Sequence, residues 1–213
     1  MNKKSIIIIG DVIKSSKQFH PGKWENFHLS IEIINEHFQS DLIIPFTIYS
    51  GDSFGAVCKD IPSAAEIILA MQEVQKYYTS RYVLIRDEIS YGIDEKNFLT
   101  LVGPALWKSE EKLNFIKKNK KLFIADLENE LLSLTLNTIL NLILSVRNDW
   151  NEQEWVVYRN FNQEVKQKEL AKQLGITQQY VSKIIRQTRM GLIKESEANL
   201  KIIINGIHSH VYP

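Results

Sequence analysis

The feature that most constrains the fold is a short apolar run near the N-terminus that ends in a glycine and an aspartate. Four consecutive isoleucines, Ile6 to Ile9, lead directly into Gly10-Asp11. A run this short and this rich in β-branched side chains predicts a strand that is buried on both faces. The run therefore favours an α/β fold with Asp11 at the end of a strand, where sheets of this class commonly place their chemistry.

A second aspartate, Asp52, lies in the segment Tyr49-Ser50-Gly51-Asp52-Ser53-Phe54. The apolar residues on either side of Gly51-Asp52 predict a β-hairpin with Asp52 near its tip. Two carboxylates on neighbouring strands suit Mg²⁺ or Mn²⁺ bound together with a nucleotide phosphate. The polar residues that follow Asp11 include Lys14 and Lys17, which would contact that phosphate or form a solvated loop. The alternative for the aspartates is structural: one ends a strand and the other makes a turn.

Composition and length bound the class of protein. The chain has 213 residues, with 44% hydrophobic and 24% charged residues, as expected for one large or two small globular domains. Its single cysteine, Cys58, fits a reducing compartment. The apolar run before Gly10 is too short for a signal-peptide core, so we expect a cytoplasmic protein.

The first 127 residues predict a β-α-β-β-α-β order, which is that of a ferredoxin-like, palm-type α/β sandwich. Amphipathic helices are predicted around residues 24–38 and 61–78, with a long strand over 82–93 and a short helix over 105–112. The basic run Lys117 to Lys121 is interpreted as a solvated loop rather than a phosphate contact.

Residues 128–150 predict a helix without charge from Leu131 to Val146. This stretch is shorter than the roughly twenty residues that span a bilayer, and serine, threonine and asparagine interrupt it. We therefore expect no membrane segment, but a buried helix that joins two domains or packs in a homodimer.

The C-terminal part, residues 151–213, carries a net charge of +3 and contains the strongest local pattern. Small and apolar residues have the spacing of a helix-turn-helix: Leu170, Ala171, Leu174, Gly175, Ile176, Val181 and Ile184. Gly175 would allow the tight turn, and Thr177 would cap the second helix and also meet DNA. The outward residues of that helix would read DNA, because their side chains pair with base edges and phosphates: Gln178, Gln179, Ser182, Lys183 and Arg186. The alternative is an all-α interaction module with the same packing but no DNA.

This C-terminal segment resembles region four of sigma factors and related bacterial regulators. Three N-terminal segments, Ile8 to Val12, Ser50 to Val57 and Val102 to Leu106, together resemble the class III nucleotidyl cyclase domain. The resemblance implies that Asp11 and Asp52 bind metal ions on a triphosphate and that Gly10, Gly51 and Gly103 approach the nucleotide. The whole arrangement is similar to the SatD family of Gram-positive bacteria.

The chain departs from the cyclase pattern where cyclases carry an asparagine and an arginine that act on the transition state. Those positions are Trp107 and Glu111 here, and a carboxylate would repel a triphosphate. We therefore expect a DNA-binding regulator whose N-terminal domain senses a metal–nucleotide, without cyclase activity. The alternatives are a metal-dependent cyclase or nucleotidyltransferase targeted by its tail, and a scaffold that binds no nucleotide.

Overall fold

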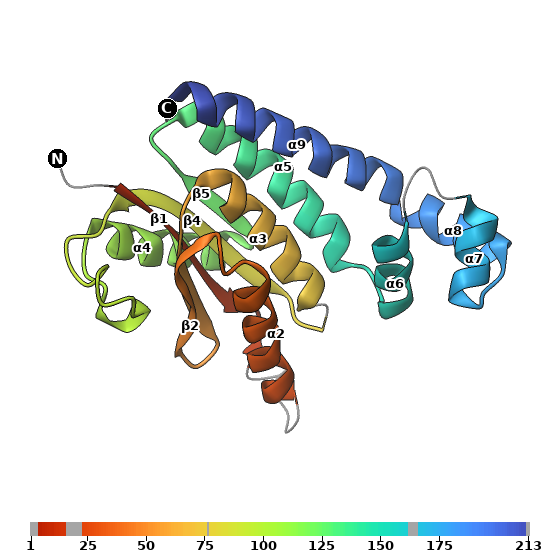
Figure 1. The fold of residues 1–213 in the computed structure, drawn as a ribbon, viewed down its shortest axis with the longest axis horizontal. Coiled ribbons are helices and arrows are strands. Elements are labelled where there is room, and N and C mark those ends of the chain that lie inside the picture. The colour runs from red at the N-terminus through yellow and green to blue at the C-terminus, as the bar shows by residue number, and fades with distance from the viewer. Residues whose placement is uncertain (1–3, 16–22, 76, 162–165, 212–213) are drawn as a thin grey trace.

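A computed structural model describes residues 4–15, 23–75, 77–161 and 166–211 (Figure 1). The described strands form one five-stranded sheet in the order β2-β3-β1-β4-β5. The central strand β1 is antiparallel to both of its neighbours, and β5 is parallel to β4. The strand bounds are Lys4–Val12 for β1, Leu42–Ser50 for β2, Ser53–Cys58 for β3, Ser80–Glu88 for β4 and Phe123–Asp126 for β5.

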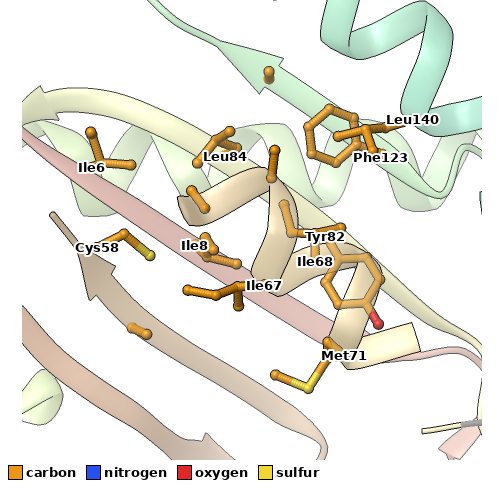
Figure 2. Close-up of a cluster of buried hydrophobic side chains, with 14 of the residues drawn as sticks. Ile6, Ile8, Cys58, Ile67, Ile68, Met71, Tyr82, Leu84, Phe123 and Leu140 are labelled. Carbon is orange, nitrogen blue, oxygen red and sulfur yellow. The ribbon is translucent and has the colours of Figure 1, made fainter. Parts of the chain in front are cut away.

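Helices cover both faces of the sheet, as the isoleucine run predicted. Ile6 and Ile8 face a core formed with α2 (Lys23–His37), α3 (Ile61–Val74) and α5 (Glu130–Asn148). Figure 2 shows this core, with Ile8 and Tyr82 of the sheet beside Ile67, Ile68 and Met71 of α3. Ile7 and Ile9 face the opposite side, where α4 (Pro104–Asn119) and the 3-10 turn η1 (Phe98–Thr100) pack. The predicted β-α-β-β-α-β order is confirmed through β4.

Two element bounds differ most from the predictions. β4 ends at Glu88 rather than at residue 93, and beyond it the chain makes only an isolated bridge between Tyr91 and Val102. The helix after Gly103 continues to Asn119 because Leu113 and Ile116 extend its buried face against the sheet. Lys117 is therefore a helical residue, and its expected place in a solvated loop was wrong.

The polar residues of α5 explain why this apolar helix packs on the sheet. The side chains of Asn137 and Asn141 bond the backbone of edge strand β5, with Ala125 N–H donating to Asn137 Oδ1 at 2.6 Å. The sheet edge is thereby covered, which removes a site for unwanted strand pairing. At 19 residues, α5 is long and apolar enough to cross a membrane by length and composition alone. The expectation that this stretch is too short to span a bilayer was therefore wrong. Contacts, rather than length, tie the helix to the sheet.

The C-terminal part is helical in its described residues. It comprises α6 (Glu152–Asn160), α7 (Gln167–Leu174), α8 (Gln178–Thr188) and α9 (Met190–Val211). The first three helices form a hydrophobic cluster together with Ile143 of α5, Trp150, and Met190 and Ile193 of α9. Helix α9 then returns alongside α5, and Leu200 and Ile204 join the core of the sheet (Figure 1). The predicted division into residues 1–127, 128–150 and 151–213 stays a prediction, with α9 belonging to both cores.

A buried arginine at the end of α5 links the two cores. Arg147 is 1% exposed, and its Nη1 atom lies 2.9 Å from Glu197 Oε1 of α9. Its Nη2 atom donates to the Leu69 carbonyl of α3 at 3.0 Å. The guanidinium also stacks over Trp155 and Tyr158 of α6, 4.7 and 5.2 Å from the ring centroids. One side chain thus contacts three helices that the sequence separates widely.

Candidate functional site

Asp11 lies at the end of β1 on the face covered by α4, because it shares its parity with Ile7 and Ile9. The residue is 5% exposed. Two cations compensate its charge: Lys117 Nζ of α4 lies 2.9 Å from Oδ2, and Arg81 Nη1 of β4 lies 3.5 Å from Oδ1. Oδ1 nevertheless accepts no hydrogen bond within the described structure. The carboxylate is therefore held by two cations, while one of its buried oxygens has no hydrogen-bond donor among the described residues.

Asp52 lies beside it, at the tip of the β2–β3 hairpin, as predicted. The Val12 N–H donates to the Asp52 carbonyl at 3.3 Å, and Asp11 pairs in register with Ser53. Gly51 adopts a left-handed conformation with φ of 57°, which makes the predicted turn. The hairpin tip thus places the second aspartate next to the end of the first strand.

The pKa of Tyr49 reflects the negative charges of this region. Burial raises the pKa of its hydroxyl to about 12, and the negative charges of Glu110, Asp11 and Asp52 add to the effect. A carboxylate raises the pKa of a tyrosine only when the two groups are close together, so all three carboxylates lie near the Tyr49 hydroxyl. Tyr49 therefore joins the two aspartates to Glu110 of α4 in one acidic neighbourhood.

An apolar cleft of about 250 Å³ opens next to these groups. Tyr49 and Phe98 line it as a stacked pair with ring centroids 5.4 Å apart. The other lining residues are Ile9, Leu99, Leu101, Leu106 and Glu110. A flat apolar ring would fit beside this aromatic pair, with the Glu110 carboxylate as the one charged group among the described lining residues.

The donor set decides what kind of metal ion would fit. Among the described residues, no three or more His, Cys, Asp and Glu side chains are grouped so as to hold a metal ion. Mg²⁺ typically binds one or two carboxylates and completes its shell with water and phosphate oxygens. Asp11 and Asp52 fit that pattern, with the unbonded Oδ1 of Asp11 as one ligand. The two carboxylates therefore suit a metal ion that completes its shell with phosphate oxygens.

The remaining residues predicted to meet a nucleotide have different surroundings. Gly10 is buried, and a Cβ atom there would lie 2.5 Å from the Phe54 ring and 2.8 Å from the Arg81 carbonyl. Its small size is thus required by packing. Lys14 is exposed, with φ of 55°, just beyond the end of β1. Lys17 lies outside the described residues.

Gly103 is not near the aspartates within one chain, contrary to expectation. A Cβ atom on it would lie 2.6 Å from Ser90 N and 2.9 Å from the Glu88 carbonyl, at the far end of β4. In register, Glu88 faces Lys4 whereas Arg81 faces Asp11. Seven residues of strand separate these ends, or about 23 Å at 3.3 Å per residue. Gly103 is the N-cap of α4, with φ of 152°, and Pro104 is the first residue of the helix.

The positions that depart from the cyclase pattern face solvent on α4. Trp107 is 66% exposed and Glu111 is also exposed. The neighbouring lysines do not replace the missing cation, because Lys108 and Lys112 bind Asp126 at 2.9 and 3.0 Å. Burial opposes ionisation of Asp126, but these two lysines outweigh it and lower its pKa. Asp126 pairs with Ile85, close to the end of β4 that is remote from Asp11.

A second candidate surface lies on α8. Gly175 ends α7 in a left-handed conformation, with φ of 66°, and Thr177 caps α8 by accepting the Tyr180 N–H at 3.2 Å. Leu170, Ala171, Val181 and Ile184 are buried between the helices, as predicted. The six residues predicted to meet DNA are all exposed: Thr177, Gln178, Gln179, Ser182, Lys183 and Arg186.

Charge is concentrated on this α7–α8 unit. Residues 166–189 contain six basic side chains and one acidic side chain, a net charge of +5. In the described structure, neither Lys183 nor Arg186 forms an ion pair with a carboxylate. The surface therefore presents uncompensated positive charge.

Sequence reasoning missed four residues of the aspartate region: Tyr49, Arg81, Glu110 and Lys117. None has a local motif that marks it. Arg81 could have been found from the strand register, since it directly faces Asp11 across the β1–β4 pair. Glu110 and Lys117 reach the region only because α4 crosses the sheet, which the sequence does not show.

Comparison with protein-family models gives a match to the SatD family over residues 5–199. This chain belongs to the SatD family. The match runs through the sheet, α5 and the α7–α8 unit, so the family includes both candidate surfaces. The comparison with curated proteins gives no match.

Two solved structures similar to this SatD-family chain are adenylyl cyclases. A bacterial light-regulated adenylyl cyclase matches with 13% identity and a TM-score of 0.43, covering 59% of this chain and 76% of that one. The adenylyl cyclase CyaB from P. aeruginosa matches with 10% identity and a TM-score of 0.40, covering 54% and 73%. At these scores the similarity carries no argument about the site, which rests on the geometry above.

Proposed function

We propose that this SatD-family protein is a DNA-binding regulator whose sheet domain binds a metal–nucleoside triphosphate. The observation that carries the DNA-binding part is the outward face of α8. Its glutamines, serine and two cations are all exposed on one capped helix, and the cations are not neutralised by the protein. A second helix of this kind typically lies in the major groove, with its N-terminal residues on base edges.

DNA binding is tested by fluorescence anisotropy with a labelled 30-base-pair duplex over a range of salt concentrations. We expect the variant carrying Lys183→Gln and Arg186→Gln to bind more weakly. The slope of log affinity against log salt should fall by about 1 for each phosphate contact removed. The variant carrying Lys118→Gln and Lys120→Gln removes two exposed charges from the end of α4 and is the matched control.

The result that contradicts this function is equal weakening in both variants, or no binding by the wild type at low salt. Equal weakening would mean that net charge alone attracts the duplex. The absence of binding would favour the alternative of an interaction module without DNA.

The metal–nucleotide part of the proposal is supported by three features: the Oδ1 atom of Asp11, which accepts no hydrogen bond in the described structure, the adjacent Asp52, and the two nearby cations. In this proposal the carboxylates hold Mg²⁺ or Mn²⁺, Lys117 and Arg81 contact phosphate oxygens, and the Tyr49–Phe98 pair receives the base. Binding rather than turnover is favoured because Trp107 and Glu111 replace the transition-state groups and Lys108 and Lys112 are paired elsewhere.

Thermal unfolding with ATP, GTP, CTP and UTP, each with and without Mn²⁺, tests this part. A ligand that binds only the native state raises its stability by RT ln(1 + [L]/Kd), or about 2.7 kcal/mol at a hundredfold excess over Kd. We expect a metal-dependent shift for at least one nucleotide that Asp52→Asn abolishes. Asp94→Asn, in an exposed turn on the chain between β4 and η1, is the matched control and should keep it.

The same samples separate the three hypotheses for the sheet domain. Chromatographic detection of a cyclic or transferred nucleotide product would favour the enzyme. A shift without product supports the sensor, and no shift with any nucleotide would leave a scaffold.

A further inference from the structure

The outer surface of α5 and α9 is strongly apolar in the described structure. On α5, Leu131, Leu134 and Leu142 are 56–66% exposed. On α9, Leu192 and Ile203 are 57% and 37% exposed. Single exposed leucines are ordinary, but a continuous group of them on one face marks an interaction surface.

These side chains form continuous stripes rather than scattered points. On α5 these leucines and the exposed Thr138 and Ser145 together recur at spacings of three and four, which places them on one side of the helix. On α9 the matching stripe runs from Leu192 through Asn199 to Ile203. The two helices lie side by side (Figure 1). Residues of both line a groove of about 520 Å³. We call this surface the α5–α9 face.

The α5–α9 face is almost free of charge. Residues 131–146 contain no charged side chain. On α9 the groove meets a charge only at Arg189, at one end. A second exposed apolar residue, Trp107 on α4, has quite different surroundings, because Glu110 and Glu111 follow it and are also exposed.

The size of the face matches a protein partner. The 19 residues of α5 span about 28 Å at 1.5 Å per residue, and two adjacent helices are about 20 Å wide. The face therefore covers on the order of 560 Å² in projection, and its accessible area is larger. A specific interface buries about 800 Å² on each partner, with the smaller examples near 600 Å².

We propose that the occupant of the α5–α9 face is a second copy of this chain. In a two-fold dimer each copy presents the same surface, so the surface must be complementary to itself. An uncharged face of two adjacent helices meets this condition, since no like charges would confront each other. Packing two such helix pairs forms a four-helix bundle in which leucines of one copy enter the groove of the other.

The chemistry of the face favours this partner over a lipid surface. Helices that lie on membranes carry lysine and arginine along their polar face, next to the apolar stripe. Only Arg189 lines the groove with positive charge. The dimer rests on neither DNA binding nor nucleotide binding, so its test is independent of both.

Light scattering after gel filtration of the full chain tests the proposal. At about 50 μM we expect the wild type at twice the monomer mass of 24.7 kDa. The Leu142→Glu and Leu192→Glu variants should elute at the monomer mass with unchanged circular dichroism, because both side chains point outward. Trp107→Glu places the same charge on an equally exposed residue of α4 and should stay dimeric.

Cross-linking provides a measurement that does not depend on disrupting the face. Thr138→Cys introduces an exposed thiol on the α5 stripe, whereas the native Cys58 is buried. A short bis-maleimide should join two Thr138→Cys chains, and should not join two Lys118→Cys chains.

Three results would overturn the proposal. One is a monomeric wild type at 50 μM with no cross-link at residue 138. Another is a dimer that Trp107→Glu dissociates and the leucine variants do not. The third is a monomer that binds vesicles of phosphatidylglycerol and phosphatidylcholine through Leu142, which would assign the face to a membrane.

Discussion

Two of the clusters in which cations meet carboxylates, those of Arg147 and Asp11, differ in how completely the cation is buried. Arg147 is 1% exposed and makes contacts with α3, α6 and α9. Asp11 is also buried, but its closest partner, Lys117, has a side chain that is 37% exposed. Each of these two side chains leaves one buried atom without a hydrogen bond in the described structure, Oδ1 of Asp11 and Nε of Arg147, but the Arg147 guanidinium is also stacked on two aromatic rings.

This difference distinguishes the Arg147 cluster, which holds helices together, from the Asp11 cluster, which is a candidate binding site. A fully buried cation cannot leave its partners without a large desolvation penalty, so Arg147 holds the helices in one arrangement. A half-exposed lysine can rotate away from its partner at little cost. The aspartate cluster can therefore exchange Lys117 for a metal ion, while the Arg147 cluster cannot exchange anything.

The largest expected effect is the loss of stability when the Arg147 cluster is disrupted. Arg147→Met should lower the free energy of unfolding by about 3–5 kcal/mol, because Glu197, whose side chain is only 17% exposed, loses its cation and the hydrogen bond to the Leu69 carbonyl is lost. Urea denaturation measures the loss. Arg159→Met is the control, since Arg159 is 39% exposed and lies 3.8 Å from Glu73, and it should cost less than about 1 kcal/mol. Equal losses of unfolding free energy in the two variants would contradict the distinction between the buried Arg147 cluster and the exposed Arg159–Glu73 ion pair.

A smaller effect is expected at the exchangeable cation. Lys117→Met should strengthen the binding of Mn²⁺ alone, because Asp11 Oδ2 becomes available. It should weaken the binding of Mn²⁺ with a nucleoside triphosphate by about 10- to 100-fold, the value of one charge-assisted hydrogen bond. Titration calorimetry measures both affinities. If both affinities moved in the same direction, Lys117 would not exchange between carboxylate and phosphate.

A third prediction tests whether the carboxylates surround Tyr49. Glu110→Gln should lower the pKa of Tyr49 from about 12, and Asp52→Asn should lower it by less, in the order of their charge effects. Ring-labelled tyrosine observed by NMR across a pH titration reads each value. An unchanged pKa in Asp52→Asn would mean that this carboxylate points away from the site.

The same tyrosine predicts a pH dependence of stability. An unfolded tyrosine loses its proton near pH 10, whereas folded Tyr49 retains it to about pH 12. The unfolded state therefore binds fewer protons between these values, so the free energy of unfolding should fall as pH rises from 10 to 12. Tyr49→Phe should make this fall shallower, and an identical slope would argue against the raised pKa.

The sequence by itself determined the local elements and their order. Four β-branched residues before Gly10 fixed a strand buried on both faces, because only a covered sheet accommodates that run. Gly51 fixed a hairpin turn and Gly175 a helix end, since both adopt φ values that other residues rarely take. Leu170, Ala171, Val181 and Ile184 fixed the packing of two short helices, because their spacing leaves one buried face on each.

Only the tertiary structure decided which charges meet. Lys117 lies 106 positions after Asp11 in the chain but contacts its carboxylate, because α4 crosses the sheet above the end of β1. Gly103, at the other end of the same helix, lies far from the aspartates for the same reason. Periodicity and capping act over a few residues and are therefore visible in sequence. The position of a helix on a sheet depends on packing between distant residues, so it emerges only when the chain is folded.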